Sequence, residues 1–343
     1  MNTIKINTPA SYIFISVASL LLLSACGGGG GGGASSPSAA SPASTLSPIS
    51  ASNAAQVASN AYAANGSIGN SSTGVSSILT GASVNGTAPG VVAPALALAK
   101  RAYANGTPAL LTGVSGTQAC SGGGTIAVSG TATGTNGPAN GDKITVTANR
   151  CVEDGATVNG TLTMAFSNIS GNLFGSGAGA ATMDLTFTAF SVTEGSTSDT
   201  VTGDMKLVMS QTSATNANLA ISGASLQNVE LKAGVKISDF RMSDYTATVA
   251  GSGTTVSVSA NYAMSGTFTS LGQVSYTVRT LKPFVAGVSG VPSSGSLIVN
   301  GAASSVTATV VPANKVRLDY SAKGDGVITQ TNTVDWAAFV IGL

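Results

Sequence analysis

Residues 256–264 read VSVSANYAM, with Val, Ala, Tyr or Met at every second position and Ser, Asn or Ala between them. This period of two is typical of a β-strand with one face on a core and the other toward water. From about Gly113 onward the chain repeats the pattern. It is clearest in residues 183–187, 274–278, 306–310 and 316–320.

Turn-forming Gly, Ser and Asn separate these runs, and no helical stretch between them is long enough to join parallel strands. The sequence therefore predicts an all-β fold, an antiparallel meander of about a dozen strands over residues 113–343. A half-barrel, an open barrel and a two-layer sandwich all remain compatible with the pattern. A change of apolar phase predicts a bulge near Ser238, and residues 323–326 (KGDG) predict a tight hairpin turn. Four glycines are expected to begin strands, namely Gly160, Gly203, Gly266 and Gly295.

The region before the predicted sheet carries no charge between Lys5 and Lys100. Residues 26–50 are Gly, Ser, Pro and Ala in the main, which predicts a flexible tether. Residues 51–112 are rich in Ala, Ser and Gly, and one or two short helices are expected there, over residues 50–64 and 90–105. We expect these helices to cover one face of the sheet.

The first 25 residues are ordered as an export signal requires. Lys5 is followed by an apolar stretch over residues 12–23 and then by small residues. A membrane-spanning helix is the alternative, but it needs about 20 apolar residues, and a run of glycines begins at Gly27. The sequence predicts a removable signal peptide over residues 1–25.

Leu23, Ser24, Ala25 and Cys26 resemble the lipobox of bacterial lipoproteins. The resemblance implies cleavage before Cys26, a diacylglycerol thioether on its sulfur and acylation of the new amino terminus, with palmitate as a typical acyl chain. It covers 26 residues and implies nothing about the mature domain. Gly27 stands where an Asp would resemble an inner-membrane retention signal, so we expect a lipid anchor in the outer membrane, on its periplasmic face or at the cell surface.

Three cysteines are present, and the lipobox accounts for one of them. Cys120 and Cys151 remain, on either side of a predicted hairpin centred near Asn136. Exported proteins keep disulfides, and the hairpin would place these residues opposite each other. We expect a structural disulfide between them, since metal ligation would need more thiols or histidines.

The composition argues against several kinds of function. Only 8% of residues are charged, and removing Lys5 from the 14 basic residues leaves 13 basic against 13 acidic, so no nucleic-acid partner is expected. The chain has no histidine, which removes the usual general base and the commonest metal ligand. We therefore expect no enzyme, no catalytic residue and no cofactor.

Carboxylates are the remaining candidates for chemistry. Glycosidases need only two of them, but Glu153 with Asp154, and Glu194 with Asp199, lie in polar turn-like segments and are expected to be solvated surface acids. The spacing of Asn136, Asn140 and Asp142 resembles a reduced calcium loop, and Asp325 lies in another turn. Turn chemistry explains both loops, so no metal site is predicted. We expect Trp336 and Phe339 to pack against the last hairpin.

Three functions fit these observations. The first is a non-catalytic, lipid-anchored envelope protein whose β domain binds a hydrophobic ligand or an envelope protein, by analogy with half-barrel lipoproteins that handle lipids. The second is a surface-exposed adhesive or structural module. The third is a transmembrane β-barrel, against which the scarcity of aromatic residues counts, at 5% of the chain.

Overall fold

The computed structural model describes most of the chain. The described residues are 45–66, 91–110, 116–133, 137–153, 155–171, 178–213, 216–287 and 290–340, with side chains to residue 103 in the second range. All belong to one compact unit, Ser44–Leu343. The predicted signal peptide, the lipobox with Cys26, Asn136 and Asp154 lie outside the described residues.

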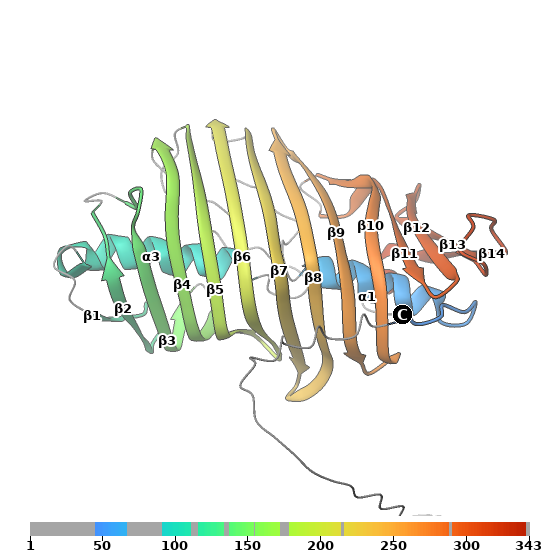
Figure 1. The fold of residues 1–343 in the computed structure, drawn as a ribbon, viewed down its shortest axis with the longest axis horizontal. Helices are drawn as coiled ribbons and strands as arrows, with labels where there is room; N and C mark the ends of the chain where they lie inside the picture. The colour runs from blue at the N-terminus through green and yellow to red at the C-terminus, as the bar shows by residue number, and fades with distance from the viewer. Residues whose placement is uncertain are drawn as a thin grey trace, which may run out of the picture. The chain divides into compact units, whose positions relative to one another are not determined.

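Fourteen strands form a single antiparallel sheet in which each strand pairs with its neighbours in the chain (Figure 1). The predicted all-β meander is therefore confirmed. The strands are β1 (Gly116–Ala119), β2 (Thr125–Thr131), β3 (Lys143–Glu153), β4 (Ala156–Gly171), β5 (Gly179–Glu194), β6 (Thr197–Ser213), β7 (Asn216–Lys232), β8 (Val235–Ser252), β9 (Thr255–Phe268), β10 (Gly272–Ala286), β11 (Pro292–Gly301), β12 (Ser304–Val311), β13 (Lys315–Ser321) and β14 (Gln330–Asp335).

The sheet is open and forms one layer. Within the described residues, β1 and β14 each have a strand partner on one side only. The strands are thus neither closed on themselves nor divided into two packed sheets, which settles the arrangement that the pattern had left open.

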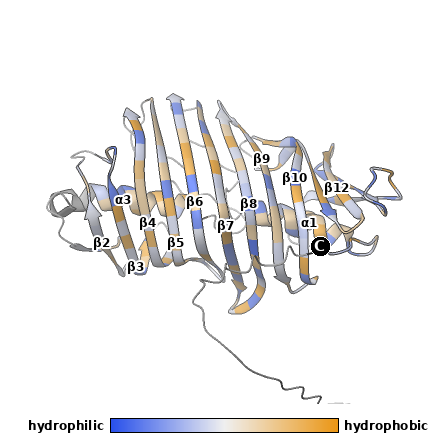
Figure 2. Cartoon of the chain, viewed as in Figure 1, coloured by the Kyte–Doolittle hydropathy of each residue, from blue (hydrophilic) through white to orange (hydrophobic). Residues whose placement is uncertain are grey.

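The two faces of the sheet differ as the alternation predicts. Met183, Leu185 and Phe187 are buried, whereas Asp184 and Thr186 between them are exposed. Apolar and polar residues accordingly alternate along the strands in Figure 2. We call the buried side, which also carries the helices, the helix face, and the opposite side the outer face.

Two helices pack on the helix face near the ends of the sheet, as expected (Figure 1). Helix α1 (Ala54–Gly66) packs on β11–β13, and α3 (Val92–Leu110) packs on β1–β4. Ser50 and Asn53 cap the start of α1 through reciprocal hydrogen bonds between side chain and backbone. Helix α3 continues past its predicted end at residue 105, through Gly106 and Pro108. Among the described helices, none has the length and apolar character needed to span a membrane.

The four glycines expected to begin strands lie inside strands instead. Each has positive φ, and at Gly160 and Gly203 a side chain would collide with a carbonyl oxygen of the next strand. The strand register shifts beside both residues. Gly160 and Gly203 thus permit bulges without ending their strands, and β4 and β6 run for 16 and 17 residues.

Three local expectations have mixed outcomes. The bulge near Ser238 is confirmed, because the β7–β8 register shifts between Ser238 and Lys236. The tight turn at residues 323–326 is wrong, since a longer loop joins Ser321 to Gln330. The predicted tether also ends earlier than residue 50. Ser47 exchanges hydrogen bonds with the backbone of Ser275 and accepts one from Ala302.

Candidate functional site

Cys120 and Cys151 form the expected disulfide. The first follows β1 and the second lies in β3, their Sγ atoms are 1.96 Å apart, and their Cα atoms are 5.4 Å apart. Thr125 pairs with Asn149 at the same end of the hairpin, which places the two cysteines opposite each other as predicted. The bridge fastens the short edge of the sheet to β3.

Glu153 lies beside this disulfide and is held in place. Its carboxylate forms an ion pair with Arg101 of α3 and accepts hydrogen bonds from the backbone and the hydroxyl of Ser121. Cys120, Cys151 and Glu153 are the one group of three potential metal ligands among the described residues. Because both sulfurs are in the disulfide, this carboxylate serves to join helix and sheet.

Asp142 holds the loop before β3 rather than facing solvent. It is 1% exposed, and its two oxygens accept hydrogen bonds from Tyr103, from the backbone and hydroxyl of Thr133, and from the backbone of Ala139. Burial alone would raise the pKa of Asp142, but these hydrogen bonds outweigh it and lower the pKa. Asn140 binds the backbone of Ile169. Turn chemistry therefore accounts for the calcium-like spacing.

Asp325 behaves similarly in the last long loop. One of its oxygens accepts hydrogen bonds from the Ser321 hydroxyl at 3.2 Å and from the backbone of Val327 at 3.0 Å. The adjacent C-terminal helix α4 (Trp336–Val340) packs on β13, β14 and α1. Trp336 and Phe339 are buried against Tyr62, which confirms their predicted packing role and adds α1 as a partner.

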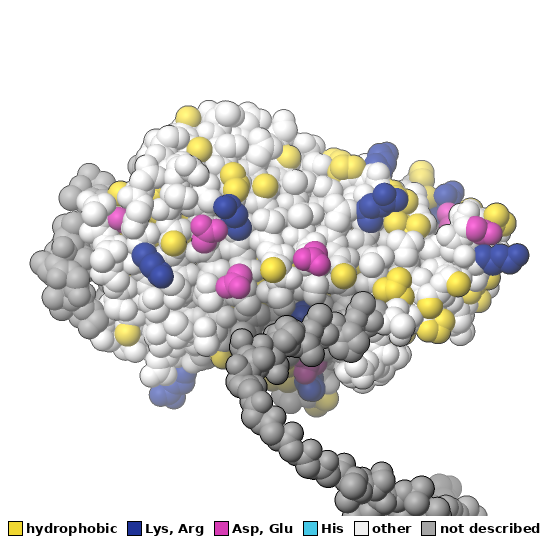
Figure 3. All heavy atoms as spheres, in the orientation of Figure 1, with side chains coloured by type: hydrophobic (Ala, Val, Ile, Leu, Met, Phe, Trp, Pro, Cys, Tyr) yellow, Lys and Arg dark blue, Asp and Glu magenta, His cyan; other side chains and the backbone are white. Residues whose placement is uncertain are grey.

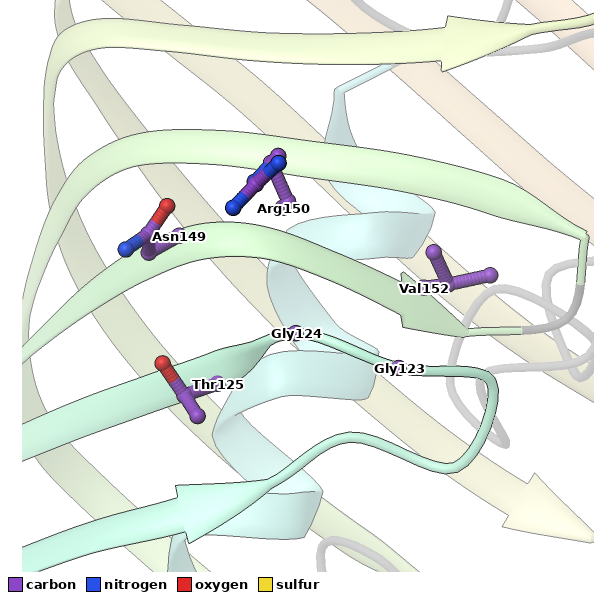
Figure 4. A pocket seen from close by; sticks show the side chains of 6 residues that line it. All are labelled: Gly123, Gly124, Thr125, Asn149, Arg150 and Val152. Carbon is purple, nitrogen blue, oxygen red and sulfur yellow. The ribbon is translucent and has the colours of Figure 1, made fainter.

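A small open hollow lies beside the β3 bulge (Figure 4). Its volume is about 410 Å³, and it is lined by Gly123, Gly124, Thr125, Asn149, Arg150 and Val152. Arg150 has positive φ, and Gly124 packs so closely on its carbonyl that a side chain there would collide with it. One arginine and two neutral polar side chains could contact a small anion here, but they do not enclose one.

Most methionines of the chain lie on the helix face. Six of the seven methionines of the chain lie in β4–β9, and all six are at most 2% exposed. They are Met164, Met183, Met205, Met209, Met242 and Met264.

Four of these methionines lie in two short rows across the strands. Met164 pairs with Leu185, which pairs with Met205, so the three side chains share a face. Met242 pairs with Met264 in the same way. Met164 lies in β4, the last strand on which α3 packs, and the other three lie between the regions of α3 and α1.

Two carboxylates interrupt this apolar face near one end of the strands. Asp199 of β6 and Glu230 of β7 are direct cross-strand partners. Val192 pairs with Asp199 on one side, and Ser238 pairs with Glu230 on the other. Asp199 is only 2% exposed, so the expectation that it is a solvated surface acid is wrong. We call Asp199 and Glu230 the acidic pair.

The surroundings of the acidic pair favour the protonated form. Burial, together with the charges of Glu230 and Glu194, raises the pKa of Asp199 to about 7, although a hydrogen bond from Asn228 lowers it. Burial also raises the pKa of Glu230, whose Oε2 accepts a hydrogen bond from Ser238 at 3.4 Å. The pair can therefore hold a proton, or bind a positively charged group, near neutral pH.

The outer face is different in chemistry. Threonine and serine hydroxyls hydrogen-bond across neighbouring strands, for example Thr145 with Thr163 at 3.1 Å and Thr248 with Ser259 at 2.6 Å. Charged side chains on this side are few and scattered (Figure 3). The outer face is thus a broad hydroxyl-rich surface of low charge.

Sequence reasoning therefore located part of the candidate site. It named the disulfide and Asp199, but it assigned Asp199 to the surface and missed Glu230 and the methionine rows. The methionines were visible as apolar positions in the alternating pattern, and their shared face follows only from the strand register. Comparison of the chain with protein-family models, curated proteins and solved structures found no match.

Proposed function

We propose that this protein is a non-catalytic envelope protein, anchored in the outer membrane through lipid on Cys26, whose β domain binds an apolar ligand on the helix face. The single observation that carries the ligand-binding role is the set of buried methionine rows. Methionine is unbranched and polarisable, so a surface rich in it adapts to ligands of differing shape.

The arrangement of the helices supports the same role. A second sheet would fix the helix face permanently, whereas here α1 and α3 are short and pack near its two ends. Helix α1 is held by few polar contacts, including Tyr262 to the carbonyl of Ala61 and Ser59 to the carbonyl of Phe339. An isolated helix of the length of α1 is marginal in water. Within the described residues neither helix packs closely on β5–β9, which carry five of the six methionines.

The chain between the proposed anchor at Cys26 and the β domain is long enough to allow a range of distances from the membrane. Ser47 is the point at which the chain joins the sheet. The 20 residues between Cys26 and Ser47 can span at most about 70 Å. A domain on such a tether can approach the membrane surface or extend well away from it.

Two measurements on the full chain, expressed in a bacterial host that processes lipoproteins, test this proposal. Mass spectrometry of the native protein, followed by the denatured protein, should reveal a non-covalent apolar ligand in addition to the covalent lipid. The Cys26→Ser variant should lose the covalent lipid, move from the membrane to the soluble fraction and keep the non-covalent ligand. Retention of Cys26→Ser in the membrane would contradict the anchor, and a ligand-free native protein would contradict the binding role.

The outer face favours a second candidate, an adhesive or structural module. Its cross-strand hydroxyl pairs offer hydrogen bonds over a wide surface with little charge repulsion. An adhesin should be cleaved by protease added to intact cells. Protection of the β domain under those conditions would remove this candidate.

A further inference from the structure

One oxygen of the acidic pair lacks a hydrogen-bond donor. Asp199 Oδ2 is buried and has no hydrogen-bond partner among the described residues. Asn228 supplies one hydrogen bond to the Asp199 carboxylate, and Ser238 supplies one to Glu230. Ionised carboxylates only accept hydrogen bonds, so the group that would satisfy Asp199 Oδ2 must be a donor.

The charges around Asp199 favour a positively charged donor. The negative charges of Glu230 and Glu194 both raise the pKa of Asp199, whereas the positive charge of Lys232 acts on Glu230. Buried like charges destabilise each other unless a proton or a cation lies between them. A neutral donor would satisfy the oxygen but leave the charge of the pair in place.

The side chains next to the acidic pair favour a ligand whose remaining part is apolar. The cross-strand row that contains the pair continues through Val192 to Val158 on one side, and through Ser238 to Phe268 on the other. The next row on the same face contains Phe190, Val201 and Phe240, with the polar Asn228 between the last two. A ligand that reaches Asp199 along this face therefore contacts apolar side chains over most of its length.

We propose that the ligand of the helix face is an amphiphile with a primary amine in its head group, and that Asp199 and Glu230 bind this amine. The inference rests on the proposed ligand-binding function. An ammonium group has three donors and one positive charge, which match the orphan oxygen and the paired carboxylates. A calcium ion fits less well, because it takes 6–8 oxygen ligands and the pair offers two carboxylates.

The test uses three amphiphiles with the same ten-carbon chain, namely decylamine, decanol and decanoate, added below their micellar concentrations. Binding to the delipidated full-length protein is followed by calorimetry at pH 7. Decylammonium should bind at least about tenfold more tightly than decanol, since a hydrogen bond to a charged group has that effect, and decanoate should bind most weakly.

Substitutions in the acidic pair test whether Asp199 and Glu230 cause the preference for decylammonium over decanol. Asp199→Asn and Glu230→Gln should each reduce the preference for decylammonium over decanol by about tenfold while leaving the affinity for decanol unchanged. Asp184→Asn removes an exposed carboxylate of the outer face and should change neither affinity. Two substitutions are used so that poor folding of one of them leaves the other to decide.

The outcomes separate this inference from the proposed function. Equal binding of decylammonium and decanol, or an unchanged preference in both variants, would overturn the assignment of the amine and leave an apolar ligand site in place. Failure of all three amphiphiles to bind would overturn the ligand-binding function itself.

Discussion

The hydroxyl of Tyr103 in α3 donates a hydrogen bond of 2.9 Å to Asp142 Oδ2, just before β3 begins. This contact joins the helix to the loop through a buried charge that accepts three other hydrogen bonds from Thr133 and Ala139. The ionised carboxylate of Asp142 therefore helps to hold α3 on the sheet.

Tyr103→Phe should lower the free energy of unfolding by about 1.5–3 kcal/mol, because it removes a hydrogen bond to a buried charge. Tyr320→Phe is the control, since Tyr320 donates to the neutral carbonyl of Ile49 and its loss should cost about 1 kcal/mol. Urea denaturation at pH 7 measures both. The lowered pKa of Asp142 means that its stabilisation is lost as the pH falls below about 4, so the effect of Tyr103→Phe should shrink in acid. Equal losses in the two variants would argue against a charged acceptor.

Asp199 should make the protein less stable as the pH rises. Its folded pKa of about 7 lies above the unfolded value, so the folded state binds the proton more tightly. The resulting stabilisation is complete below about pH 4 and is lost by about pH 7, with an upper limit of about 4 kcal/mol. Thermal unfolding of delipidated protein between pH 4 and pH 8 measures it. Asp199→Asn should reduce the dependence to the part that Glu230 contributes, since burial raises the pKa of Glu230 as well. The exposed-site variant Asp184→Asn should keep the full dependence, and an unchanged slope in Asp199→Asn would assign the titration elsewhere.

Loss of the Cys120–Cys151 bridge should lower the free energy of unfolding by about 3–4 kcal/mol, the expected effect of closing a loop of this size. Urea denaturation of the Cys120→Ser/Cys151→Ser double variant measures the change. Dithiothreitol should destabilise the Cys26→Ser protein by a similar amount and leave a triple variant without cysteine unaffected. A denaturation midpoint that does not respond to reductant would show that the bridge contributes nothing.

Gly160→Ala should destabilise the protein by about 3 kcal/mol or more, because the new methyl group collides with the carbonyl oxygen of Ala189 and the backbone has positive φ. Gly155→Ala also has positive φ but meets no neighbouring atom, so it should cost about 1–2 kcal/mol. Comparing the two by urea denaturation separates collision from backbone strain. Similar losses would mean that the bulge relaxes around the methyl group.

The fold class could be predicted because the residues of each strand alternate between a buried and an exposed face. Met183–Leu185–Phe187 alternate with exposed residues whatever the neighbouring strands are. The strand ends were harder to predict, since Gly160 and Gly203 resemble strand breakers in sequence and act as bulge partners in the sheet. Only the register with the next strand distinguishes these two roles.

The candidate site was partly hidden for the same reason. Asp199 follows a Gly/Ser/Thr turn, and the sequence beside it reads as solvated. Its burial depends on Val192 in β5 and on Glu230 and Ser238, which lie 31 and 39 positions further along the chain. The disulfide was easier to predict, because a single hairpin brings Cys120 and Cys151 together.

The neighbour-only pairing of the fourteen strands has a consequence for how such a protein can change over time. Removal of two consecutive strands, such as β6 and β7, would bring β5 beside β8 still in antiparallel orientation. Repetitive structures with contacts between adjacent units tolerate gain or loss of units. Duplication or deletion of whole hairpins could therefore widen or narrow the sheet in steps of two strands, and with it the length of molecule that the face accommodates, without altering the order of the rest.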